Sequence, residues 1–167
     1  DYILFEGEAA HWNYGSIRYN SSIPLNAVPP LPDQVPASIF FTGSPSSYSS
    51  RGITAILIGD DNTKISGFIN DPYSEPPSPD YVQISIRSQN GPDFYLVFRM
   101  AAGQPLVPGT YVNAVWPPSS DPSLPGLKFL PSSYYDIPLN GYFTILEATN
   151  YGGLLFSFAA DFMQYDY

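Results

Sequence analysis

The stretch that most constrains the fold is Gly141–Tyr165, near the C-terminal end of the sequence. Its first part, Tyr142–Thr149, is rich in β-branched and aromatic residues, and the Asn-Tyr-Gly-Gly that follows suits a hairpin loop, which needs residues that tolerate positive φ. The next part, Leu154–Met163, alternates with period two. Its predicted core-facing residues are Leu154, Phe156, Phe158, Ala160 and Phe162, and the residues between them face away. The pattern predicts a β-hairpin whose second strand is central to a sheet.

The rest of the sequence consists of short apolar segments separated by turn residues, without helical periodicity. Strands are predicted over Asp1–Gly7, Ser16–Tyr19, Ala37–Thr42, Ile53–Ile58, Thr63–Ile69, Tyr81–Arg87, Phe94–Met100, Thr110–Trp116, Leu127–Leu130 and Tyr134–Ile137, with a turn-like segment over Glu8–Gly15. Three Pro-rich segments, Asn20–Pro36, Asn70–Asp80 and Pro117–Gly126, are predicted loops because proline fixes φ and lacks an N–H donor. We therefore expect one all-β domain over residues 1–167. Its expected architecture is an antiparallel, jelly-roll-like β-sandwich of about ten to twelve short strands.

Composition excludes several classes of function. Hydrophobic residues make up 44% of the chain and charged residues 13%, which indicates a folded protein. Fifteen Asp and Glu against six Lys and Arg give a net charge of −9, which disfavours nucleic acid and anionic membranes as partners. No apolar run reaches membrane-spanning length, so membrane insertion is not expected. The absence of Cys excludes disulfides, thiolate metal sites and Cys nucleophiles.

The C-terminal half, over about Asp93–Gln164, contains an ordered series of segments: Phe94–Phe98, Gly103–Tyr111, Asn113-Ala114, Pro125–Leu127, Gly141–Glu147 and Phe158–Gln164. This series resembles an uncharacterised family of secreted bacterial β-rich modules. Members usually carry two cysteines that the resemblance implies are disulfide-bonded, whereas this chain has Ser132–Asp136 and Tyr165–Tyr167 in those regions. The resemblance implies a secreted β module and brings no activity or catalytic residues. The sequence also begins inside a predicted strand, as a mature product does after signal removal and as a shortened chain does. From the resemblance, an extracellular or cell-surface location is expected.

Few residues suggest chemistry. Glu6, Glu8 and His11 are the nearest approach to a catalytic or metal cluster, but they also suit a solvated strand end. Asp60 and Asp61 are the other clustered acids; calcium is an alternative there, but Asp and Asn are ordinary turn residues. Motifs for Ser nucleophiles, zinc proteases and phosphate loops are missing. We expect a non-enzymatic protein with no catalytic residues, cofactor or metal. A glycosylation sequon, Asn20-Ser21-Ser22, matters only if the source glycosylates proteins.

Aromatic residues are the main anomaly, with 14 Tyr, 11 Phe and 2 Trp. Two functions account for them, because exposed Tyr and Trp favour contacts. The first is a structural or interaction protein that self-associates as a surface or filament subunit, with Tyr2, Ile3, Leu4 and Phe5 as the strand lent to a neighbouring copy; pairing of that strand within its own domain is the alternative. The second is a carbohydrate-binding module that stacks polysaccharide on aromatic rings. Its candidate stacking residues are Trp12, Tyr14, Trp116, Tyr134 and Tyr135.

Overall fold

A computed structural model describes the backbone in eleven parts of the chain. These parts are residues 11–19, 21, 23, 37–47, 52–60, 62–69, 81–89, 93–116, 121–131, 139–151 and 154–166. The strands predicted at Asp1–Gly7 and Tyr134–Ile137 lie outside them. No helix occurs within the described parts, and therefore none that is long and apolar enough to cross a membrane.

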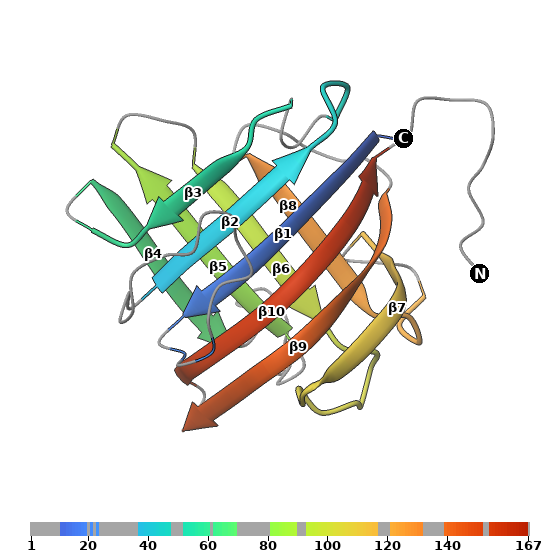
Figure 1. Cartoon of the computed structure of the whole chain (residues 1–167). Coiled ribbons are helices and arrows are strands. Elements are labelled where there is room, and N and C mark those ends of the chain that lie inside the picture. Colours follow the sequence, from blue (N-terminus) through green and yellow to red (C-terminus); the bar gives the residue numbers. More distant parts are fainter. Residues whose placement is uncertain are drawn as a thin grey trace.

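The described residues form ten strands, which confirms the prediction of an all-β chain (Figure 1). The strands are β1 (His11–Tyr19), β2 (Ala37–Gly43), β3 (Ala55–Ile58), β4 (Thr63–Ile69), β5 (Tyr81–Ser88), β6 (Phe94–Arg99), β7 (Gly109–Val115), β8 (Gly126–Pro131), β9 (Leu139–Tyr151) and β10 (Leu154–Asp166). They belong to one sheet in the order β3-β2-β1-β10-β9-β7-β8-β6-β5-β4. Adjacent strands are antiparallel except for β7 and β8, which run parallel where Val115 lies opposite Gly126.

The single sheet folds back on itself and is nearly closed into a barrel. Strands β3, β2, β1, β10, β9 and β7 form a front layer that crosses a rear layer of β4, β5, β6 and β8 (Figure 1). On one side the turn between β3 and β4 links the layers, with the Asp60 N–H donating to the Thr63 carbonyl. On the other side β8 pairs with both β6 and β7. Because β8 makes the ladder continuous, the structure shows one mixed sheet and does not show the expected jelly-roll-like sandwich of two antiparallel sheets.

Phenylalanine rings fill the space between the layers. Phe98 of the rear layer is fully buried, and its ring centroid lies 5.3 Å from that of Phe143, 5.2 Å from that of Phe158 and 6.1 Å from that of Phe162. Phe129 lies 5.4 Å from Phe162 and joins a second ring group toward the other end. Ring pairs at these spacings add to the area that they bury. Within the core, a connected group of Phe rings therefore ties β6 and β8 to β9 and β10.

A β-bulge in β10 overturns part of the predicted alternation. Leu155 lies opposite Asn150 and Ser157 lies opposite Thr149, so Phe156 is the extra residue. Leu155 is consequently 7% exposed and belongs to the core, whereas Phe156 is 72% exposed. The prediction that Phe156 faces the core was wrong. For Phe158, Ala160 and Phe162, beyond the bulge, it is confirmed.

The prediction of a turn over Glu8–Gly15 was also wrong where the structure describes that segment, because β1 begins at His11. This strand lies between β2 and β10. Asn13 and Gly15 stand at the core-facing positions of this segment, where an apolar alternation would have indicated a strand. Pairing on both sides, rather than local pattern, makes this segment a strand.

Candidate interaction surface

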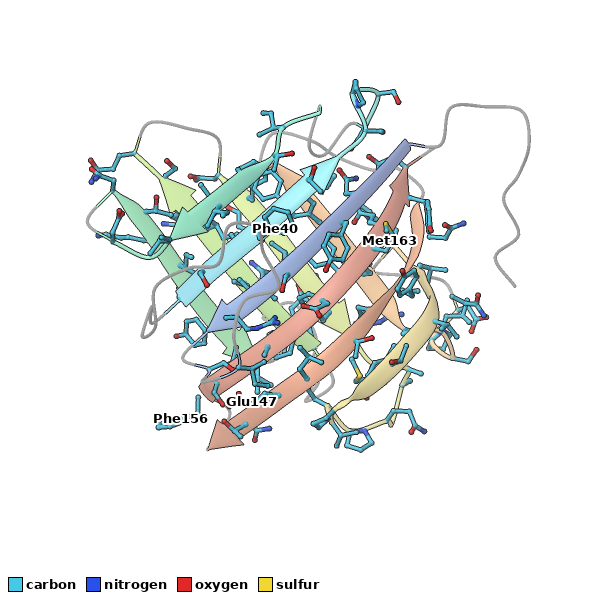
Figure 2. All side chains as sticks on the ribbon, in the orientation of Figure 1. Phe40, Glu147, Phe156 and Met163 are labelled. Atoms are coloured by element: carbon cyan, nitrogen blue, oxygen red, sulfur yellow. The ribbon has the colours of Figure 1, made fainter. Side chains whose placement is uncertain are left out.

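The outward side of the front layer carries large apolar side chains. On β1 the core-facing residue is Ile17, and Tyr14, of opposite parity, faces out. Tyr14 lies opposite Met163 of β10, which in turn lies opposite Tyr142 of β9. The rings of Tyr14 and Phe40 meet edge to face, with centroids 6.2 Å apart. Figure 2 labels Phe40 and Met163 on this side of the barrel.

We call this set the aromatic patch. Its members face outward, are partly exposed and come from the five consecutive strands β3, β2, β1, β10 and β9. They are Tyr14, Phe40, Ile56, Tyr142, Met163 and Tyr165. Contiguous apolar groups on an outer sheet face are unlike the scattered apolar residues of an ordinary surface. The patch is therefore the most distinctive surface of the described structure.

The outward side of the rear layer differs in chemistry. Strand β5 presents Gln83, Ser85 and Arg87, with the Gln83 amide donating to the Ser85 hydroxyl at 3.3 Å. The rear-layer strands also hold Lys64, Arg99 and Lys128, so four of the six Lys and Arg of the chain belong to this layer. The outward side of the rear layer is thus the more polar and basic of the two, although it also holds Tyr81 and Tyr95.

A partly buried ion pair lies beside the aromatic patch. Arg18 Nη1 lies 3.1 Å from Asp161 Oδ1 and also donates to the carbonyls of Ile17 and Ala160. Ser16 donates to the same carboxylate oxygen at 2.6 Å. The side chain of Arg18 is 4% exposed and that of Asp161 27%. Because these groups satisfy one another, we interpret them as a structural link between β1 and β10 rather than as a reactive pair.

A second carboxylate, Glu147, is held by hydroxyl groups. Ser157 donates to Glu147 Oε1 and Ser21 donates to Oε2, each at 2.5 Å, and the Thr149 hydroxyl lies within hydrogen-bond distance of Ser157. Figure 2 labels Glu147 on β9. Each carboxylate oxygen already accepts a hydrogen bond, and the arrangement lacks a basic partner that would activate a serine. This cluster joins β9, β10 and Ser21 and suggests no reaction.

Buried polar groups close one end of the barrel interior. The Asp166 carboxylate accepts hydrogen bonds from Asn13, Ser47 and Gln164 at 3.0, 2.8 and 3.2 Å. The Gln164 amide is also bidentate to the Phe129 backbone, accepting from its N–H at 2.7 Å and donating to its carbonyl at 3.0 Å. Buried polar groups stabilise a fold when they are satisfied in this way. The cluster fastens the end of β10 and the turn after β2 to the barrel.

The structure brings together only part of the predicted stacking set. Tyr14 belongs to the aromatic patch, whereas Trp116 follows β7 and has Lys128 Nζ 4.3 Å from its ring centroid. Trp12 pairs through its backbone with Tyr165, but its side chain lies outside the described residues. The other predicted site residues also lie outside them: Tyr2, Ile3, Leu4, Phe5, Tyr134 and Tyr135, together with Glu6 and Glu8.

Sequence reasoning missed Phe40, Ile56 and Tyr142 as surface residues. Their signal is their parity: each alternates with core residues on its own strand. That signal marks a residue as outward-facing, but the order of strands in the sheet is needed to show that the residues form one patch.

Asp60 serves the turn between β3 and β4. Its Oδ1 accepts from the N–H groups of Asn62 and Thr63 at 2.8 and 2.7 Å, an Asx-type arrangement. Asp61, the other half of the calcium alternative, lies outside the described residues, as does the His11 side chain. Within the residues that the structure describes, no three His, Cys, Asp or Glu gather as metal ligands.

No family model, curated protein or solved structure matches this chain. The resemblance of Asp93–Gln164 to secreted bacterial modules accordingly stays a prediction.

Proposed function

We propose that this chain is a secreted, non-enzymatic structural or interaction protein that self-associates, as a surface or filament subunit, and buries the aromatic patch in the contact. The observation that supports this function is the contrast between the two outer faces. A sheet face that needs only to meet water carries polar residues at alternate positions, as β5 of the rear layer does at Gln83 and Arg87. The front layer instead presents Tyr14, Phe40 and their neighbours.

The energetics of the aromatic patch suit a repeated contact. Burial of apolar surface contributes about 25 cal/mol per Å². Tyr and Phe give large contact area at low conformational cost, and such residues dominate the binding energy of interfaces. The net charge of −9 opposes association of identical copies. Assembly should therefore strengthen as salt screens that repulsion.

The test of self-association is particle size, measured by light scattering over a salt series. We expect the size to rise with salt and protein concentration for the unchanged protein, and to fall for Tyr14→Ser. Tyr95→Ser is the matched control, because Tyr95 is a partly buried tyrosine on the outward side of rear-layer strand β6. If both variants lost assembly to the same extent, the self-association contact could not be assigned to the aromatic patch. A protein that stays monomeric at high concentration and high salt would overturn the proposed function.

The alternative is an extracellular carbohydrate-binding module. Partly buried Trp116 and the Tyr14–Phe40 ring pair favour it, since aromatic rings at a surface stack on sugars. Under this alternative Trp116→Ala should abolish retention of the folded protein on immobilised polysaccharide, while the matched Phe156→Ala variant, altered at an exposed aromatic residue of β10, is retained. Under the self-association proposal neither substitution changes retention. Retention measured by affinity electrophoresis therefore separates the two functions.

A further inference from the structure

Strand β8 loses its neighbour on one side soon after it begins. Strand β7 pairs with it only where Val115 lies opposite Gly126, and there the Val115 N–H donates to the Pro125 carbonyl at 2.9 Å. Beyond this point β8 continues to Pro131 with β6 along one side, and no described strand pairs with its other side. An unpaired strand edge is a template for a strand of another chain.

One side chain occupies this edge. Gln164 of β10 is fully buried, and its amide accepts from the Phe129 N–H at 2.7 Å and donates to the Phe129 carbonyl at 3.0 Å. A residue of a neighbouring antiparallel strand would exchange the same two hydrogen bonds with Phe129. The side-chain amide thus takes the place of one residue of the missing strand.

The rest of the β8 edge offers little to an added strand. The backbone groups of alternate residues point to the same edge of a strand, so those of Leu127 and Pro131 point the same way as those of Phe129. Pro131 has no N–H to donate, and Leu127 lies next to the bridge to Val115. Phe129 is therefore the position at which a strand could add, and Gln164 closes it.

We propose that Gln164 is an autoinhibitory contact, which seals the β8 edge and prevents a strand of another copy from adding to it. The core-facing residues of β10 from Phe158 to Phe162 are apolar, and Gln164 follows them as a fully buried amide. Without it, the N–H and carbonyl of Phe129 would lose their partners, which favours a new partner for both groups. The inference goes beyond the proposed function and does not depend on it, because it concerns a contact that the unchanged protein avoids.

Hydrogen exchange in dilute solution tests the seal directly. In the unchanged protein the Phe129 amide should exchange as slowly as the ladder amides of β6, because Gln164 accepts from it. In Gln164→Leu this amide should exchange about tenfold faster, while the ladder amides of β6 change less. The matched control is Ser47→Ala, which leaves both bonds to Phe129 in place. It removes a hydroxyl of the same buried cluster that lies 2.6 and 2.8 Å from Asn13 Oδ1 and Asp166 Oδ2.

Light scattering at high protein concentration tests the consequence. Particles of Gln164→Leu should be several-fold larger than those of Ser47→Ala, and the difference should persist when Tyr14→Ser is added to both. Equal particle sizes would overturn the inference, and so would a Phe129 amide that exchanges in the unchanged protein as fast as an unstructured one.

Two further outcomes are decided in advance. If Gln164→Leu does not fold, Gln164→Asn is measured in its place against the same expectations, because its side chain lacks one methylene and does not reach both groups of Phe129. If the unchanged protein never assembles while the Gln164 variant does, the inference stands and the proposed self-association fails.

Discussion

Replacing Phe98 with Ala should lower the free energy of unfolding by about 3–5 kcal/mol. The side chain is fully buried and its ring contacts those of Phe143, Phe158 and Phe162, so truncation removes apolar burial and leaves a cavity between the layers. These neighbours belong to β9 and β10 and hold one another in place, which limits collapse of the cavity. The measurement is a urea titration followed by intrinsic fluorescence.

The matched control is Phe156→Ala, the same substitution at the β10 bulge, where the side chain is 72% exposed. Its free energy of unfolding should stay within about 0.5 kcal/mol of the unchanged protein. Equal destabilisation of the two variants would show that the bulge does not turn Phe156 outward. It would also contradict our assignment of the β10 residues that form the core.

The second large effect is expected at Gly15 of β1. A Cβ built at this position lies 2.2 Å from Phe162 Cζ, far inside van der Waals contact. The Phe162 ring has little room to move because it packs against Phe98 and Phe129. Gly15→Ala should therefore destabilise the protein by about 1–3 kcal/mol through overpacking. The same urea titration measures the loss.

Two further variants test that explanation. Phe162→Leu shortens the side chain that Gly15 meets, so the double variant Gly15→Ala, Phe162→Leu should be more stable than the sum of the two single losses predicts. Gly59→Ala is the control for the glycine substitution itself, since its Cβ meets its nearest neighbour at an ordinary 3.4 Å. A Gly15→Ala variant as stable as Gly59→Ala, or strictly additive losses, would contradict the close approach of β1 to β10.

The sequence predicts best where strands alternate without interruption. In the predicted strands Tyr81–Arg87 and Phe94–Met100, a period of two places Val82, Ile84 and Ile86 on one side and Phe94, Leu96 and Phe98 on one side, and all six are core residues. Prediction failed at Phe156 because a one-residue bulge turns this side chain outward, and the alternation of Phe156, Ser157 and Phe158 gives no sign of the bulge.

Pairing between distant segments was beyond the reach of the sequence. The segment Glu8–Gly15 has the composition of a turn, yet from His11 onward it is a strand because it is paired on both sides. Likewise, alternation along β10 predicts that Met163 faces outward. It does not show that Met163 lies between Tyr142 of the adjacent hairpin strand and Tyr14, which is distant in the sequence. The candidate surface is thus a property of strand order, which local patterns do not encode.

The pairing of the first and last described strands has a consequence for how this chain folds. Arg18 and Asp161, joined across β1 and β10, are 143 residues apart in sequence. Contacts between residues so far apart in sequence are slow to form, because the intervening chain must lose conformational entropy before the contact contributes any stabilisation. During synthesis the front layer remains without β10, its central strand, until that strand leaves the ribosome. Until then Phe98 and Phe129 of the rear layer lack the rings of β10 that pack against them, and the nascent chain is vulnerable to aggregation.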